Sequence, residues 1–161
     1  MVARGTSHDE RIAELHDFLQ QMMRVGDEFF AVQLEEFGLT LLQYAALEAI
    51  DRLGPEVAVG EVGDAIHAPP SSMTGLTNRL VSAGLVERST PPENRRTVVL
   101  RTTPEGHELV RAIDGRQRES LGIVLSDFSD DDVQRFQSLL ARIKANMERW
   151  LVGGGKPLAR D

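Results

Sequence analysis

The stretch from Val59 to Arg101 constrains the fold more than any other part of the chain. A short helix is predicted over residues 60–66, because the His-Ala-Pro-Pro segment that follows disfavours continued helix. Pro70 suits the first turn of a second helix, over residues 70–83, and Gly84 suits a left-handed cap at its C-terminal end. Two short helices joined by a tight turn are therefore expected here.

The second of these helices has an apolar face and a polar face. The apolar side chains recur at helical spacing and are Met73, Leu76, Leu80 and Val81. The polar side chains are Ser71, Ser72, Thr74, Thr77, Asn78 and Arg79. Residues 85–89 and 97–101 then have strand composition, and the polar loop 91–96 between them ends on two arginines. Together these elements predict a winged helix-turn-helix.

Amphipathic helices are predicted on both sides of this stretch. Residues 9–35 and 40–53 precede it, and residues 103–126 and a last helix after Ser129 follow it. Val57–Val59 suits one edge strand beside the ribbon. The expected fold is therefore mainly α with a small β-wing.

The starts of three of these helices carry local signals. Thr40 with Gln43, and Ser129 with Asp132, have the spacing of N-terminal capping boxes. Thr103 is followed by proline and glutamate, which suits a capping residue and the first helical turn. These signals fix the expected helix boundaries on either side of the winged region.

The helices at the two ends of the chain carry more apolar surface than one copy would cover. A helix of about 27 residues spans about 40 Å, which is longer than a small lobe needs. A second copy is the expected cover, which predicts a homodimer whose terminal helices form a shared bundle. The expected division is an arm and dimerisation helix at 1–35, a winged lobe at 36–102, dimerisation helices at 103–152 and a flexible tail at 153–161.

The net charge of −7 at first argues against a nucleic-acid partner. The charge is segregated, however, because residues 66–101 contain five arginines and two glutamates, a local net charge of +3. Average charge is a poor guide in such a chain. The basic stretch is therefore compatible with DNA binding.

Several protein classes are disfavoured by what the sequence lacks. Without cysteine the chain has neither disulfides nor thiolate metal sites, and its four scattered histidines lack paired helical spacing, so no metal or other cofactor is expected. No apolar run approaches the ~20 residues of a membrane span. The first ten residues lack the apolar core of a secretory signal. A cytoplasmic protein without a membrane partner is expected.

Local motifs resemble those of the MarR family of transcriptional regulators over nearly the whole chain. The motifs are Thr74-x-Leu76 followed by Asn78-Arg79-Leu80, then Gly84-Leu85-Val86-Glu87-Arg88, a loop with Pro92, Asn94, Arg95 and Arg96, and Thr103-Pro104-Glu105-Gly106. The resemblance implies a homodimer on double-stranded DNA with a pseudo-palindromic operator. It places helix 70–83 in the major groove, Arg79 at a phosphate and Arg96 in the adjacent minor groove. The DNA contacts that it implies are Pro70, Ser71, Ser72, Thr74, Gly75, Thr77, Asn78, Arg79, Asn94, Arg95 and Arg96.

Two positions depart from the family pattern. Asn94 stands where an aspartate usually pairs with an arginine of the wing, and asparagine carries no charge. Gly75 stands where many members have a base-reading arginine, and glycine costs about 1 kcal/mol of helix stability relative to alanine. Base reading would then fall to neighbouring polar side chains or to close approach of the backbone.

The resemblance also implies repression that is released by a small phenolic or carboxylate effector. Candidate lining side chains are His16, Gln20, Tyr44 and Arg88, of which the arginine is suited to pair with a carboxylate. Structural alternatives stand beside these roles: a buried tyrosine hydroxyl, or an arginine at a phosphate or helix end. Similarly, Arg95 and Arg96 can form a solvated turn, and Ser71 and Ser72 can satisfy the amides of a helix start.

Two other functional classes remain open at this stage, a winged helix used for protein contact without DNA and a small helical enzyme. Adjacent acids such as Glu35 and Glu36 do not face one another on a helix. The sequence contains no phosphate loop, nucleophile elbow or metal motif. The favoured interpretation is a sequence-specific DNA-binding regulator, most simply a repressor, without enzymatic activity.

We predict that Arg96→Ala lowers the affinity for operator DNA broadly, because a minor-groove arginine is attracted mainly by phosphate potential and groove width. The slope of log affinity against log salt concentration should become shallower by about one unit per chain. Fluorescence anisotropy at several salt concentrations measures both quantities. Wild-type affinity at every salt concentration would remove the loop 91–96 from the DNA interface.

Overall fold

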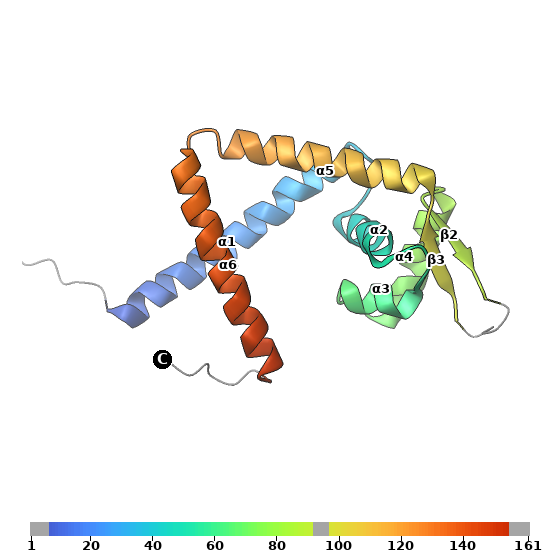
Figure 1. The fold of residues 1–161 in the computed structure, drawn as a ribbon, viewed down its shortest axis with the longest axis horizontal. Helices are drawn as coiled ribbons and strands as arrows, with labels where there is room; N and C mark the ends of the chain where they lie inside the picture. The colour runs from blue at the N-terminus through green and yellow to red at the C-terminus, as the bar shows by residue number, and fades with distance from the viewer. Residues whose placement is uncertain (1–6, 92–96, 155–161) are drawn as a thin grey trace, which may run out of the picture. The chain divides into compact units, whose positions relative to one another are not determined.

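The computed structural model describes residues 7–91 and 97–154. The chain divides into two compact units, residues 1–117 and residues 118–161. The helices and strands in chain order (Figure 1) are α1 His8–Glu35, α2 Leu41–Leu53, β1 Val57–Ala58, α3 Val59–Ala65, α4 Pro70–Ser82, β2 Val86–Ser89, β3 Val99–Thr102, α5 Pro104–Val124 and α6 Asp130–Val152. The predicted class, mainly α with a small β-wing, is confirmed.

Capping boxes define the starts of the long helices. The Thr40 hydroxyl accepts a hydrogen bond from the Gln43 amide at 3.3 Å, and the Gln43 side chain accepts one from the Thr40 amide at 2.8 Å. Ser129 and Asp132 form the same reciprocal pair at α6, and the bonds from Ser129 lower the pKa of Asp132. Both boxes were predicted. A third box, Ser7 with Glu10, starts α1 and was not predicted.

A three-stranded antiparallel sheet with strand order β1-β3-β2 forms the wing and its base. Val57 of β1 pairs with Leu100 of β3, and on the other side Arg88 of β2 also pairs with Leu100. The predicted edge strand is confirmed, although β3 begins two residues later than expected. The sheet therefore ties the segment before α3 to the ribbon that follows α4 (Figure 1).

The core of the first unit lies where α2, α3, α4 and the sheet meet. Its buried apolar residues are Leu34, Leu39, Ala46, Leu47, Ala49, Ile50, Val57, Val62, Met73, Leu76, Leu80, Val86, Leu100, Val110 and Ile113. The first half of α5 thus packs on the winged lobe through Val110 and Ile113. Val81, expected to face inward, is exposed, because it lies at the margin of the apolar stripe.

The joint between α4, the sheet and α5 is unusually close. Gly84 follows α4 with φ +72°, and the Thr103 hydroxyl donates to the Gly84 carbonyl at 2.7 Å. The same hydroxyl accepts a hydrogen bond from the Gly106 amide at 3.0 Å, while the Thr103 amide donates to the Leu85 carbonyl at 3.0 Å. The predicted left-handed cap and the capping threonine are therefore parts of one contact.

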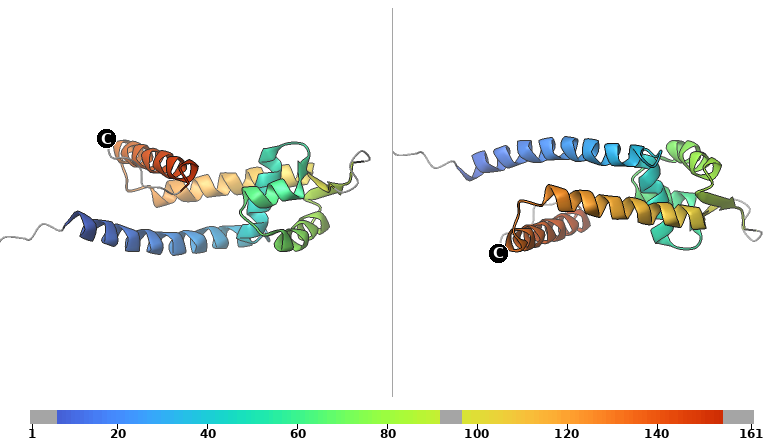
Figure 2. Two further views of the ribbon diagram at one scale, coloured as in Figure 1. Left: turned by 90° about the horizontal axis from the view of Figure 1, so that it is seen from below. Right: turned by 90° about the horizontal axis from the view of Figure 1, so that it is seen from above.

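The terminal helices leave long apolar faces exposed. Only Gln33 and Leu34 of α1 are buried, and α6 has no buried residue. Both are continuous helices (Figure 2). Exposed apolar side chains include Ile12, Leu15, Phe18, Leu19, Met22 and Met23 of α1, and Phe136, Leu139, Leu140, Ile143, Met147, Trp150 and Leu151 of α6. The wide apolar stripes predicted from the sequence are present and uncovered.

The compact units divide within α5, whereas the sequence placed a functional boundary before residue 103. The physical reason is that the first half of α5 contributes to the winged-lobe core. Assignment of residues 1–35 and 103–152 to dimerisation stays a prediction. Residues 155–161 of the expected tail lie outside the described residues.

Gly106→Ala should destabilise the fold, because a Cβ there would lie 2.3 Å from the Leu85 carbonyl oxygen and 2.8 Å from Thr102 Cγ2. Overpacking of this kind typically costs about 1–3 kcal/mol. Gly75→Ala is the matched control, since nothing lies within 4 Å of its added Cβ and the helix should gain up to about 1 kcal/mol. Urea unfolding compares the two variants, and equal midpoints would contradict the close joint.

Candidate nucleic-acid interface

The outward face of α4 consists of small polar side chains. Pro70, Ser71, Ser72, Thr74, Gly75, Asn78 and Arg79 are exposed, as the predicted DNA contacts require. Pro70 occupies the first turn, and no side chain caps the helix start. A helix start that lacks a side-chain cap can offer backbone N–H groups to an anion such as a phosphate.

Thr77 was predicted on this exposed face, but it is fully buried. Its hydroxyl donates to the Met73 carbonyl at 2.8 Å, so this buried donor has a hydrogen-bond partner. A threonine can be buried in a helix in this way because its hydroxyl bonds back to the preceding turn. Thr77 therefore supports α4 from within, and its side chain is not part of the exposed face.

Arg88 of β2 holds the recognition helix α4 to the wing. Its Nη2 donates to the Thr77 hydroxyl oxygen at 2.7 Å, and its Nη1 donates to Asn78 Oδ1 at 3.0 Å. One guanidinium thus bridges two successive residues of the helix. Arg88 was predicted to line an effector site, with a phosphate or helix-end contact as the alternative; the structure shows it bonded to Thr77 and Asn78 within α4, and the effector role stays a prediction.

A hollow of about 430 Å³ opens between α4 and the base of the wing. Thr74, Arg88 and Thr97 are the polar residues of its lining, and the remaining lining comes from Ala58, Val59, Gly60 and Val98. Sequence reasoning had assigned Thr74 to DNA and Arg88 to an effector. The structure brings these two side chains to one place beside the recognition helix.

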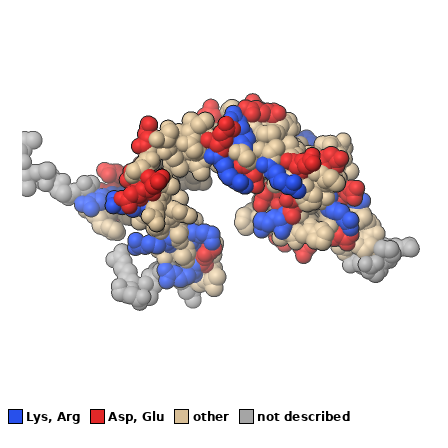
Figure 3. All heavy atoms as spheres, turned by 45° about the horizontal axis from the view of Figure 1, so that its top comes forward, with Lys and Arg blue, Asp and Glu red and all other residues tan. Residues whose placement is uncertain are grey.

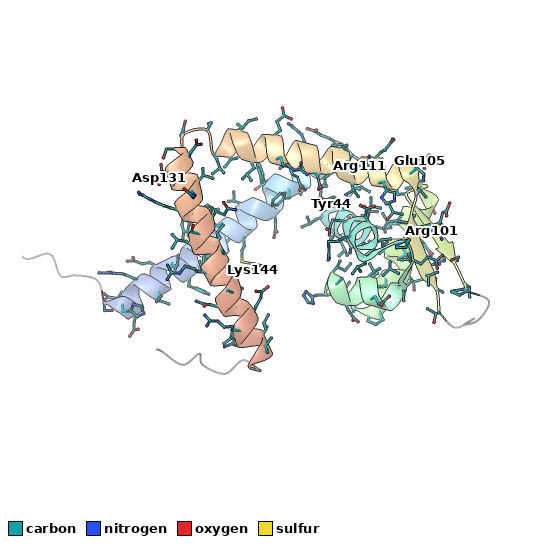
Figure 4. The ribbon with its side chains drawn as sticks, viewed as in Figure 1. Tyr44, Arg101, Glu105, Arg111, Asp131 and Lys144 are labelled. Atoms are coloured by element: carbon teal, nitrogen blue, oxygen red, sulfur yellow. The ribbon has the colours of Figure 1, made fainter. Side chains whose placement is uncertain are left out.

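The other predicted effector residues do not line the hollow beside α4. The hydroxyl of Tyr44, which is labelled on α2 in Figure 4, donates to Asp114 Oδ1 on α5 at 2.9 Å. Burial, followed by the hydrogen bond to Asp114, raises the pKa of Tyr44 above its ordinary value. His16 and Gln20 are exposed on α1. The structure therefore supports the structural alternative for Tyr44 and not a lining shared with Arg88.

The charges around the wing are partly compensated. Arg101 of β3 pairs with Glu56 at 2.6 Å, and both side chains are about half exposed. Acidic and basic side chains lie interspersed on the face drawn in Figure 3. The predicted contacts Asn94, Arg95 and Arg96 lie outside the described residues.

Among the described residues, 7–91 and 97–154, no group of three or more potential metal-ligating side chains occurs. Within the same ranges, no helix is long and apolar enough to cross a membrane.

The helix-turn-helix, the antiparallel wing and the exposed polar face of α4 together define a winged helix-turn-helix protein. Residues 37–97 match the family model described as MarR family. Over 140 residues the chain is 24% identical to the uncharacterized HTH-type transcriptional regulator YsmB of Bacillus subtilis (strain 168), covering 87% of this chain and 95% of that protein.

Solved structures agree with this match. The crystal structure of MarR superposes with a TM-score of 0.71 at 27% identity, covering 84% of this chain and 98% of the other. A MarR family protein from Bacillus stearothermophilus gives a TM-score of 0.79 at 22% identity, covering 89% and 99%. The chain therefore has the fold of MarR-family winged-helix proteins, and its residues 37–97 are similar to the MarR family of transcriptional regulators.

The single tyrosine of the chain makes the Tyr44–Asp114 contact measurable. Tyrosinate absorbance should appear at higher pH in the folded protein than in urea, where the pKa returns to about 10. A raised folded-state pKa contributes stability that is fully present below about pH 10 and is lost as pH rises through the folded value. Tyr44→Phe should remove this alkaline loss and cost about 1 kcal/mol at neutral pH. Identical titrations of the folded and unfolded chains would contradict the contact.

Proposed function

We propose that the chain is a dimeric, sequence-specific DNA-binding repressor whose recognition helix α4 enters the major groove. The observation on which this rests is the arrangement of α4, which buries Met73, Leu76 and Leu80 and leaves small polar side chains outward. Small polar residues allow the helix backbone to approach base edges, and their hydroxyl and amide groups can hydrogen-bond to bases or phosphates. A winged helix used only for protein contact has no need of this pairing with a basic ribbon.

Dimerisation is proposed from the uncovered apolar faces of α1 and α6. Phe136, Ile143 and Met147 are all more than half exposed on α6, on one side of a helix that buries nothing in its own chain. Contiguous apolar surface on this scale marks an association surface. A two-fold dimer would present two copies of α4 to successive major grooves, which suits a pseudo-palindromic operator.

A small anionic effector is proposed to act at the hollow beside α4. Arg88 is a charged donor in its lining, and Thr74 of the recognition helix lies in the same wall. A carboxylate paired with this guanidinium would compete with DNA phosphates for the same charge. Coupling of this kind is typically about 1–3 kcal/mol and reciprocal, so DNA would weaken effector binding equally.

DNA binding is tested by fluorescence anisotropy with the upstream region of the protein's own gene and a scrambled duplex of equal length. Affinity for the upstream duplex should exceed that for the scrambled one and should fall steeply with salt. Repeating the titration with benzoate tests the effector, which should weaken binding. Equal affinity for both duplexes would refute sequence-specific regulation at that site, and an absence of binding would favour a protein-contact role.

Ile143→Glu should convert the dimer into a monomer, because the new carboxylate would be buried against the apolar face of a second copy. Ser138→Glu is the matched control, since it adds the same charge on the opposite, polar side of α6. Light scattering after size-exclusion chromatography gives the mass of each variant. A dimer in both cases would show that this face of α6 is not the interface.

A further inference from the structure

Asn78 occupies the centre of the outward face of α4. With about 100° between successive helical residues, Asn78 and Ser71 lie opposite the buried side chains of Met73, Leu76 and Leu80. Asn78 is exposed, whereas its neighbour Thr77 is fully buried. If α4 enters the major groove, as the proposed function has it, Asn78 is the side chain that faces the base edges most directly.

The side-chain oxygen of Asn78 is already engaged by the protein. Arg88 Nη1 donates to Asn78 Oδ1 at 3.0 Å. The same guanidinium is anchored by Nη2, which donates to the Thr77 hydroxyl oxygen at 2.7 Å. The Thr77 hydroxyl donates its own hydrogen to the Met73 carbonyl, so toward Arg88 its oxygen acts as the acceptor. The anchor is therefore directional and rests on a buried residue.

The backbone of Arg88 is also held in place. Arg88 lies on β2 and pairs with Leu100 of the central strand β3, which is fully buried. Both ends of this arginine, the backbone in the sheet and the guanidinium on Thr77, are thus defined by the folded core. Such a doubly anchored donor can fix the orientation of an exposed amide.

We propose that Arg88 is a positioning residue that restricts Asn78 to reading DNA as a hydrogen-bond donor. An asparagine usually recognises adenine with two bonds, its oxygen accepting from N6 and its amide donating to N7. Oδ1 can still accept a second hydrogen bond, but the bond from Arg88 holds the oxygen on the side of β2. In this proposal the amide hydrogens are then the groups presented to the base edges. They match guanine, which offers N7 and O6, or thymine, which offers O4. Cytosine presents only a donor at this edge, and adenine loses one of its two bonds.

This inference rests on the proposed function and adds the base class that one residue selects. The operator need not be known, because wild-type protein can select its own sites from a duplex library with a randomised segment. Binding to point variants of the selected site then gives the preference at each position. The wild type should prefer guanine or thymine over adenine or cytosine by about fivefold or more at one symmetric position in each half-site.

Three variants separate the parts of the inference. Asn78→Ala should reduce that preference about fivefold or more and leave other positions unchanged. Arg88→Met frees the oxygen of Asn78 and should shift the preference toward adenine. Arg79→Met is the matched control for lost charge, because Arg79 lies on α4 with Asn78, whereas the bond to Asn78 Oδ1 comes from Arg88 of β2. It should lower affinity for all sequences without changing the base preferences.

Asn78→Asp provides a test that does not require removing Arg88. The carboxylate can accept the same bond from Arg88 but offers no donor, so the preference should move to cytosine, whose N4 group donates. Thermal unfolding confirms that each variant is folded.

If the wild type selects sites but Asn78→Ala, Arg88→Met and Asn78→Asp all keep its base preferences, the inference is overturned and the proposed function stands. A wild type that selects no sequence overturns the proposed function and the inference together.

Discussion

The hydrogen-bonded joint at Thr103 is the constraint on which the placement of the recognition helix depends. One hydroxyl donates to the carbonyl of Gly84, just beyond α4, and accepts from the amide of Gly106 in the first turn of α5. The Thr103 amide meanwhile bonds to the Leu85 carbonyl ahead of β2. Helix α4, the sheet and α5 therefore share one set of contacts. A displacement of the first turn of α5 must therefore either carry α4 with it or break these bonds.

The apolar side chains of the protein fall into two groups, a buried core and exposed helix faces. Around α2, α3, α4 and the sheet, side chains such as Ile50, Leu80 and Leu100 have no exposed surface, and that lobe needs no second chain to be packed. The stripes on α1 and α6 have comparable apolar character but stay exposed. This contrast within one sequence is why the proposal of a dimer rests more on burial than on composition.

Sequence patterns predicted what depends on local geometry. The capping boxes at Thr40 and Ser129 and the positive φ of Gly84 each depend on a few adjacent residues, and they were found where expected. Thr77 was misplaced because it lies at the edge between the two faces of α4. Periodicity alone does not say which way such a residue turns. Its hydroxyl can be satisfied by the preceding turn, so burial costs little.

The candidate site was harder to predict because its contacts join distant segments. Tyr44 and Asp114 are 70 residues apart, and no spacing rule links them. Arg88 was recognised as a functional candidate, but its bonds to Thr77 and Asn78 depend on how β2 returns along α4. These pairings arise from the tertiary fold. The sequence identified the residues, but these partners within the chain could not be predicted from local spacing.

The partners of the arginines decide how an acidic chain can present positive charge to DNA. Arg101 faces Glu56, so its charge is largely compensated before any phosphate arrives. Arg88 is held instead by a hydroxyl and an amide oxygen, which orient the guanidinium without neutralising it. Neutral acceptors of this kind keep the full charge of the arginine available to a phosphate or a carboxylate. The net charge of −7 is therefore compatible with DNA binding. The electrostatic potential at α4 depends mainly on nearby charges, because salt screens the contribution of acidic residues farther away.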